Sequence, residues 1–136
     1  MSLSTRSTTK PRPSRALPPG ELGIILANGD GIKFRGGDRL VAQWPDGELL
    51  YCRVTHKHPG GKLECFILNG FWGLTFNSRR EGAMRDNPTR KATIVMKLPT
   101  RLRGVRDMED FEVVLAKAER QLERESARRV AESTAR

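Results

Sequence analysis

The 136-residue chain has few of the residues that build disulfide frameworks or membrane spans. Cys52 and Cys65 are its two cysteines, too few for the disulfide framework of a small secreted domain. No run approaches the roughly 20 apolar residues that span a bilayer, and the first residues lack the apolar stretch of a secretory signal. We therefore expect a cytoplasmic protein, nuclear if its source is eukaryotic, with reduced thiols and no membrane partner.

Motifs that carry catalysis are also missing from the sequence. It has no glycine-rich phosphate loop with Lys and Ser or Thr, no Gly-x-Ser-x-Gly, and no pair of carboxylates within apolar sequence. Asp30, Asp38 and Asp46 stand beside glycine, where aspartate commonly binds the local backbone. Cys52 and His56, four residues apart on one strand, would lie about 13 Å apart, too far for a nucleophile and its base. We expect a protein that is not an enzyme and needs no cofactor.

A metal site is an alternative that the residue spacing disfavours. Cys52, His56, His58 and Cys65 lie close together, and positions 52, 54, 56 and 58 share one face of a regular strand. The spacing lacks the tight Cys-x₂-Cys knuckle that is typical of structural zinc. We therefore predict two thiols beside two surface histidines, and no metal.

Positive charge dominates the sequence and is unevenly distributed. The formal net charge is +9, from 25 Lys and Arg against 16 Asp and Glu. Residues 1–20 contribute +4 without any acid, residues 21–100 another +4, and residues 101–136 only +1. Because a basic surface attracts polyanions, nucleic acid or an acidic protein is the expected partner class.

The chain divides into three segments by composition. Residues 1–20 are rich in Ser, Thr, Pro, Arg and Lys and predict a disordered basic arm. Residues 21–99 hold short β-like runs between turn signals and predict one small β-domain. Residues 100–136 predict a C-terminal helix and tail.

Six short runs in the middle segment read as strands. Pro-Asp-Gly, His-Pro-Gly-Gly and Asn-Gly sequences separate several of them, and the Asn-Gly pair at 69–70 predicts a tight turn with positive φ angles. The runs are Leu22–Leu26, Arg39–Trp44, Glu48–Lys57, Lys62–Leu68, Phe71–Phe76 and Ala92–Leu98. Residues 77–90 are polar and predict a long connection. The fold class that follows is mainly β, a small antiparallel SH3-like barrel of five or six strands.

The C-terminal segment changes to a helical period. Met108, Phe111, Leu115 and Leu122 recur along one stripe together with Ala118, and Asp107 is the expected N-cap. The stripe ends after Leu122, which is short for an independent coiled coil. Three roles stay open for this interaction helix: packing against the domain or the barrel of a neighbouring copy, formation of a homodimer through the helix, and folding that depends on a partner.

The stretch GDRLVAQWPDGELLYCRVTHK, residues 37–57, resembles the opening of a Tudor-type or related SH3-like barrel. Its continuation GGKLECFILNGFWGLTF, residues 60–76, is similar to strands three and four of that fold. The resemblance implies an aromatic cage that holds a methylated ammonium, with Trp44, Tyr51 and Trp72 at the matching positions. It equally implies binding of nucleic acid or protein, because many barrels of this kind lack a cage.

Alternation along the strands suggests another role for one of these aromatics. Trp44 shares a face with Leu40 and Ala42 in the predicted strand, so the barrel interior is its alternative place. Core packing is expected for at least two of Trp44, Phe66 and Phe76. Tyr51 and Trp72 each carry a polar group suited to a partner contact.

The leading functional feature is a set of basic residues around the last predicted strand. Arginine forms bidentate contacts with phosphate, which makes this set the candidate nucleic-acid interface. Its members are Arg79, Arg80, Arg85, Arg90, Lys91, Arg101 and Arg103. We therefore expect a binding module associated with nucleic acid, with a protein-interaction or assembly factor and a methyl-lysine reader as the alternatives.

Overall fold

The computed structural model describes residues 20–26, 33–70, 72–99 and 110–134. The predicted arm, apart from Gly20, lies outside these ranges, as do Arg101, Arg103, Asp107 and Met108. The described elements are strands β2 (Ile24–Ile25), β3 (Arg39–Gln43), β4 (Leu49–Lys57), β5 (Leu63–Ile67), β6 (Trp72–Phe76), β7 (Glu81–Met84) and β8 (Asn87–Lys97), a 3₁₀ turn at Pro59–Gly61, and helix α1 (Phe111–Thr134).

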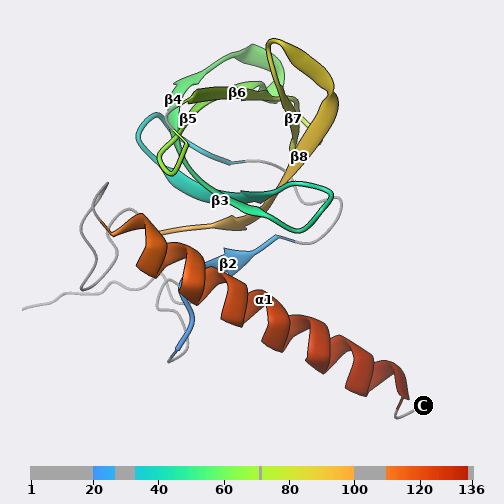
Figure 1. Ribbon diagram of the computed structural model, residues 1–136. Helices are drawn as coiled ribbons and strands as arrows, with labels where there is room; N and C mark the ends of the chain where they lie inside the picture. Colours follow the sequence, from blue (N-terminus) through green and yellow to red (C-terminus); the bar gives the residue numbers. More distant parts are fainter. Residues whose placement is uncertain (1–19, 27–32, 71, 100–109, 135–136) are drawn as a thin grey trace, which may run out of the picture.

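Six strands close into an antiparallel barrel, seen end-on in Figure 1. Each strand from β3 to β8 pairs with the next, and β8 returns to pair with β3. The short strand β2 adds to β8 outside the ring. The mainly β fold class is confirmed, and the architecture is consistent with the small SH3-like or Tudor-like barrel implied by the resemblance.

The His-Pro-Gly-Gly sequence forms the turn of a hairpin between β4 and β5, with Gly60 and Gly61 at φ angles of 82° and 85°. The next turn differs from its prediction, because neither Asn69 nor Gly70 has a positive φ. Asn69 instead uses its side chain: Oδ1 accepts a hydrogen bond from the Tyr51 amide at 2.9 Å, and Nδ2 donates to the Leu49 carbonyl at 3.3 Å. The amide group thus continues the pairing to β4 beyond the end of β5.

The long connection predicted for residues 77–90 is wrong. It contains all of β7 and the beginning of β8, which pair with each other from Glu81↔Thr93 to Met84↔Asn87. The β7 sequence Glu-Gly-Ala-Met has no β-branched residue and therefore gives no strand signal of its own. Pairing with β6 on one edge and β8 on the other makes it a strand.

The barrel interior is filled by inward-facing side chains from every strand of the ring. Trp44 and Phe76 belong to this cluster at 2% and 0% exposure, which confirms the core role expected for two of the three aromatics. Cys52 and Cys65 lie in the same cluster as free thiols. Phe34 joins it from the segment before β3, and the Lys97 ammonium lies 5.3 Å from its ring centroid.

A second apolar cluster lies outside the ring, between the barrel and the elements β2 and α1. Val41 and Tyr51 contribute from the barrel, and Val114 and Ala118 from the helix; all four have 0% exposure. Figure 1 shows α1 crossing beside the barrel and running on past it. With 24 residues, the helix is about 36 Å long.

Gln121 connects the helix to the N-terminal strand segment. Its side chain is 3% exposed, and its Oε1 accepts hydrogen bonds from the amides of Leu22 at 2.7 Å and Gly23 at 3.4 Å. Its Nε2 donates to the Gly23 carbonyl at 2.8 Å. The glycine is required here, because a Cβ on Gly23 would lie 2.5 Å from the Lys97 carbonyl oxygen. One amide group therefore satisfies three buried backbone groups.

Replacing Gln121 with Leu keeps the side-chain volume but leaves these backbone groups unpaired. We expect the free energy of unfolding to fall by about 2–3 kcal/mol, because buried polar groups without partners are destabilising. Urea denaturation measures the change, with Glu123→Leu on the exposed side of the same helix as the control. Equal stabilities for the two variants would contradict a structural role for the Gln121 amide.

Candidate functional site

The predicted basic residues do not form one cluster. Arg79 lies in the turn between β6 and β7, and Arg85 lies in the turn between β7 and β8. These turns are at opposite ends of β7, so the two residues are roughly 15–20 Å apart along the strand direction. Lys91 lies on the outer face of β8, and all three side chains are exposed.

Arg80 has a structural role. Its side chain is 4% exposed and Nη1 donates to the Ile94 carbonyl at 3.0 Å, while its own carbonyl accepts from the Ile94 amide at 2.9 Å. Among the described residues other than glycine, Arg80 is the one with a positive φ angle, 69°. The predicted contact between Arg80 and a nucleic acid is therefore corrected, since its guanidinium is buried against β8.

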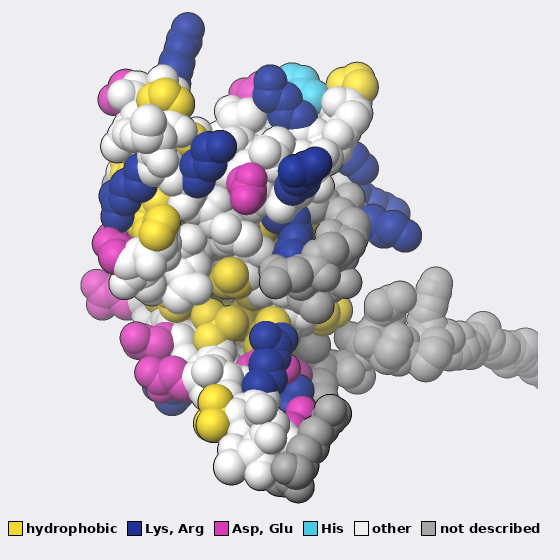
Figure 2. All heavy atoms as spheres, turned by 90° about the vertical axis from the view of Figure 1, so that its right-hand side faces the viewer, with side chains coloured by type: hydrophobic (Ala, Val, Ile, Leu, Met, Phe, Trp, Pro, Cys, Tyr) yellow, Lys and Arg dark blue, Asp and Glu magenta, His cyan; other side chains and the backbone are white. Residues whose placement is uncertain are grey.

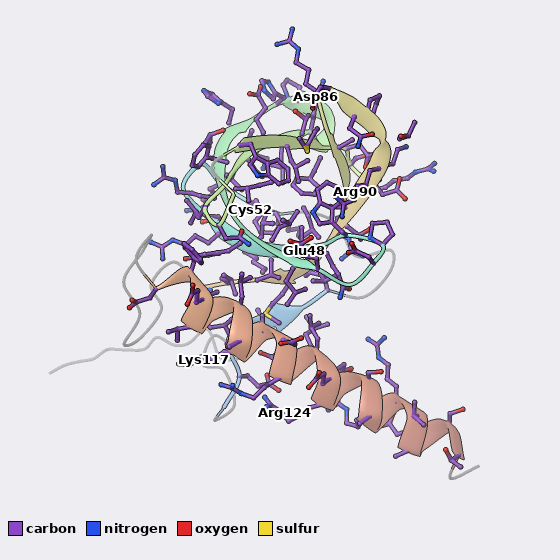
Figure 3. All side chains as sticks on the ribbon, viewed as in Figure 1. Glu48, Cys52, Asp86, Arg90, Lys117 and Arg124 are labelled. Carbon is purple, nitrogen blue, oxygen red and sulfur yellow. The ribbon has the colours of Figure 1, made fainter. Side chains whose placement is uncertain are left out.

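Arg90 is engaged with its own barrel. Its guanidinium lies 4.1 Å from the centroid of the Trp44 ring, and Nη2 is 3.1 Å from an Asp46 carboxylate oxygen and 3.9 Å from one of Glu48. In Figure 3 it projects across the end of the barrel towards Glu48. The Arg90 side chain is 42% exposed, whereas the Trp44 ring beneath it is 2% exposed. Arg90 therefore covers the ring from the solvent side and acts as a lid over Trp44.

Two tryptophans close this end of the barrel together. The Trp44 and Trp72 rings stack with centroids 6.0 Å apart and an interplanar angle of 18°. Trp44 comes from the end of β3 and Trp72 from the start of β6, two antiparallel strands whose ends meet there. A hollow of about 450 Å³ lies beside Trp44 and Lys91, next to the β3–β4 turn.

Tyr51 does not join the two tryptophans. It faces α1 rather than the barrel interior and has 0% exposure, and its hydroxyl accepts a hydrogen bond from Arg39 Nη1 at 3.2 Å. The partner contact predicted for Tyr51 is thus corrected to packing under the helix. The three aromatics expected to form a cage lie in two different parts of the molecule.

The predicted interaction stripe on the helix faces the barrel. Phe111, Leu115 and Leu122 are partly buried against the cluster that holds Tyr51. The most buried face of α1 is Val114, Ala118 and Gln121. It shares Ala118 with the predicted stripe, and its other two members each lie one position before a stripe residue. Beyond residue 122 the helix is largely exposed, and Val130 has 63% exposure.

The cysteines and histidines point to opposite sides of the barrel wall. The pairing register of β4 and β5 shifts between Val54 and His56, as at a β-bulge, so the side chains of Cys52 and His56 do not share a face. His58 binds Glu64 on the outer surface and holds the pKa of that carboxyl below its usual range. Among the described residues, no three His, Cys, Asp or Glu side chains converge as a metal site requires.

Charge is concentrated on the barrel and balanced on the helix. Residues 33–99 carry 12 Lys and Arg against 6 Asp and Glu, a formal charge of +6, whereas α1 carries 5 of each. Figure 2 shows Lys and Arg side chains spread over the barrel on the face in view. Within the described ranges, no ion pair joins a carboxylate to Arg79, Arg85 or Lys91.

The described helix is too polar to cross a bilayer.

No family model, no curated protein and no solved structure matches this chain. The chemistry of its own residues is therefore the basis for assigning a function.

Replacing Arg90 with Ala tests the lid over Trp44. Because Trp44 and Trp72 are the two tryptophans of the chain, intrinsic fluorescence reports on this end of the barrel alone. We expect emission at longer wavelength, stronger acrylamide quenching and a loss of stability of about 1 kcal/mol. Arg79→Ala, at an exposed position in the turn at the other end of β7, is the control. Emission identical to that of the unmodified protein would show that Arg90 does not shield the ring.

The buried thiols predict a loss of stability in alkaline solution. Burial raises the pKa of Cys65 to about 12 and the pKa of Cys52 well above its usual range. Between pH 9 and these values, the unfolded chain releases thiol protons that the folded protein keeps. The free energy of unfolding should therefore fall as the pH rises through this window, and the fall should be smaller in Cys65→Val. Urea denaturation at neutral and alkaline pH measures both, and the same pH dependence in the two proteins would contradict the assignment.

Proposed function

We propose that the chain is a binding module that associates with nucleic acid through the basic surface of its barrel. The observation that carries this proposal is the charge of +6 on residues 33–99 beside a helix with equal numbers of acidic and basic residues. Phosphate neutralisation by Lys and Arg supplies most of the affinity of sequence-independent nucleic-acid binding. The proposed role needs no cofactor, and reduced thiols suit the cytoplasm or a nucleus.

Three exposed residues are the proposed contacts. Arg79 and Arg85 lie in turns, and Lys91 lies on the outer face of β8. None of them forms an ion pair with a described carboxylate, so an approaching phosphate does not have to displace one. Arg90 is excluded from this set, because Asp46 and Glu48 already neutralise it.

A second candidate function is protein interaction through the far half of α1. From residue 123 onwards the helix is largely exposed, and Glu125 pairs with Arg128 and Arg129 along the helix itself. Helical residues without tertiary contacts gain little stability from packing, which favours a partner for this segment. A homodimer formed through it is the simplest form of this alternative.

Binding of a labelled oligonucleotide at several salt concentrations tests the first proposal. We expect the logarithm of the affinity to fall linearly with the logarithm of salt, because bound phosphates release counterions. Arg79→Ala/Arg85→Ala should lower that slope by about 1.4, because each phosphate neutralised on a single strand contributes about 0.7. Arg128→Ala/Arg129→Ala removes the same charge from the helix and should leave the slope unchanged.

A different pair of results would favour the second candidate function, protein interaction through the far half of α1. Absence of oligonucleotide binding at low salt, together with a protein partner that stays bound after nuclease treatment, would contradict a nucleic-acid role.

A further inference from the structure

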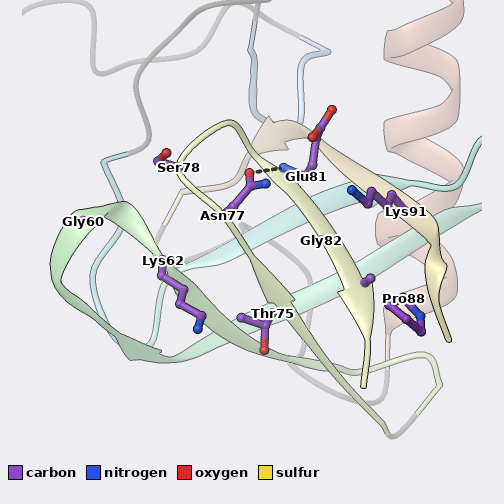
Figure 4. A pocket seen from close by; sticks show the side chains of 10 residues that line it. Gly60, Lys62, Thr75, Asn77, Ser78, Glu81, Gly82, Pro88 and Lys91 are labelled. Carbon is purple, nitrogen blue, oxygen red and sulfur yellow. Dashed lines mark hydrogen bonds between the residues drawn. The ribbon is translucent and has the colours of Figure 1, made fainter. Parts of the chain in front are cut away.

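A groove of about 480 Å³ follows the outer surface of β6 and β7 (Figure 4). Its floor includes Thr75 and Ala83, which lie opposite each other in the pairing of the two strands. Lys62, which immediately precedes β5, and Lys91 of β8 border it on either side. The groove extends from the Gly60 turn to Pro88, so it connects the two ends of the barrel.

The groove exists because the residues along its floor are small. The pairing register places Glu64, Thr75, Ala83 and Lys91 in one row across four strands. The two central members of this row have the shorter side chains, whereas the two outer members have long ones. The surface is therefore lowest over β6 and β7.

Hydrogen-bond donors line this depression. Thr75 and Ser78 carry hydroxyls, and the two lysines carry ammonium groups. The Asn77 Oδ1 accepts from the amides of Arg79 at 2.8 Å and Glu81 at 3.1 Å, which orients the side chain. Because the Oδ1 atom of Asn77 is the one that binds the backbone, its Nδ2 group can donate hydrogen bonds to a ligand.

The charge of the groove is positive. Glu81 is the one acid among the described lining residues, and Figure 4 shows its side chain pointing away from Thr75. Lys62 and Lys91 outnumber it, and the exposed residues Arg79 and Arg85 lie in the turns at the two ends of β7. Glu64, the β5 member of the row described above, binds His58. An anion along the groove therefore meets Lys62 and Lys91 at its sides and Arg79 and Arg85 near its ends.

We propose that this groove holds the sugar–phosphate backbone of a single-stranded nucleic acid, an inference that rests on the proposed function. Lysines, hydroxyls and a free amide are the groups that contact phosphate oxygens in such complexes. A single strand can lie along β6 and β7 with its phosphates towards the two lysines, whereas only one of the two backbones of a duplex can lie in the groove.

The lining also predicts whether binding depends on the nucleotide sequence of the strand. No aromatic side chain is among the described residues that line the groove, so it offers no surface on which a base could stack. The bases of a strand held by its backbone would point to solvent. Binding should therefore be nearly independent of sequence and should favour single strands over duplexes.

The experiment compares two double variants that remove the same charge. Lys62→Ala/Lys91→Ala acts on the groove, and Arg53→Ala/Lys57→Ala acts on exposed residues of β4 outside it. Fluorescence anisotropy with labelled oligothymidylate should give an affinity about tenfold weaker for the groove pair, with a salt slope lower by about 1.4. The β4 pair should weaken binding less than about threefold, through the long-range field alone.

A third variant blocks the groove without changing its charge. Ala83→Phe places a ring on the floor and should weaken oligothymidylate binding about tenfold, because the strand can no longer lie along β6 and β7. Val113→Phe, at a position of α1 with 43% exposure, is the matched control and should bind normally. Thermal unfolding of each variant verifies that the barrel remains folded.

Three results would overturn the inference. Equally weakened binding in the two double variants, with normal binding by Ala83→Phe, would place the strand elsewhere on the barrel while leaving the proposed function intact. Groove-dependent binding of polyglutamate in place of oligothymidylate would identify an acidic protein as the occupant. Failure of the unmodified protein to bind any oligonucleotide would remove the proposed function together with the groove assignment.

Discussion

Strand β8 is the element on which the rest of the structure depends, because its two edges hold three neighbours. One edge pairs with β7 along residues 87–93 and with β2 at Met96 and Lys97, and the other edge pairs with β3. The β7 pairing closes the ring and encloses the interior cluster. The β2 pairing brings the N-terminal segment beside α1, where Gln121 can bind its backbone.

Closure of the barrel determines which of its surfaces a partner can reach. Side chains fill the inside of the ring, including both thiols, and the two tryptophans with Arg90 cover one end. The helix and β2 cover the outer side of the barrel at Val41, Tyr51 and Met96, on β3, β4 and the end of β8. The outer face of β6, β7 and the first half of β8 is not covered by them, and the groove between Lys62 and Lys91 lies there. The proposed function thus depends on the same strand pairing that makes the fold.

The sequence predicted those features that depend on local pattern. Alternation and turn residues located six of the seven strands, and the resemblance over residues 37–76 anticipated the barrel. Strand β7 was missed because tertiary pairing alone makes it a strand. A bulge in β4 turns His56 outward, and α1 buries Tyr51. Neither the bulge nor the helix contact can be recognised from the residues near these positions in the sequence. Gln121 could not be recognised as a core residue, because a polar side chain on a helix usually faces solvent.

Chemical-shift mapping by NMR is the sharpest test of the groove as a binding surface, since it reports on each backbone amide of the folded protein while a single-stranded oligonucleotide is added. We expect the largest shifts on the amides of Lys62, Thr75, Ala83 and Lys91, with α1 and the outer face of β4 nearly unchanged. Shifts concentrated on residues 123–134 of the helix, or no shifts at all, would refute the assignment.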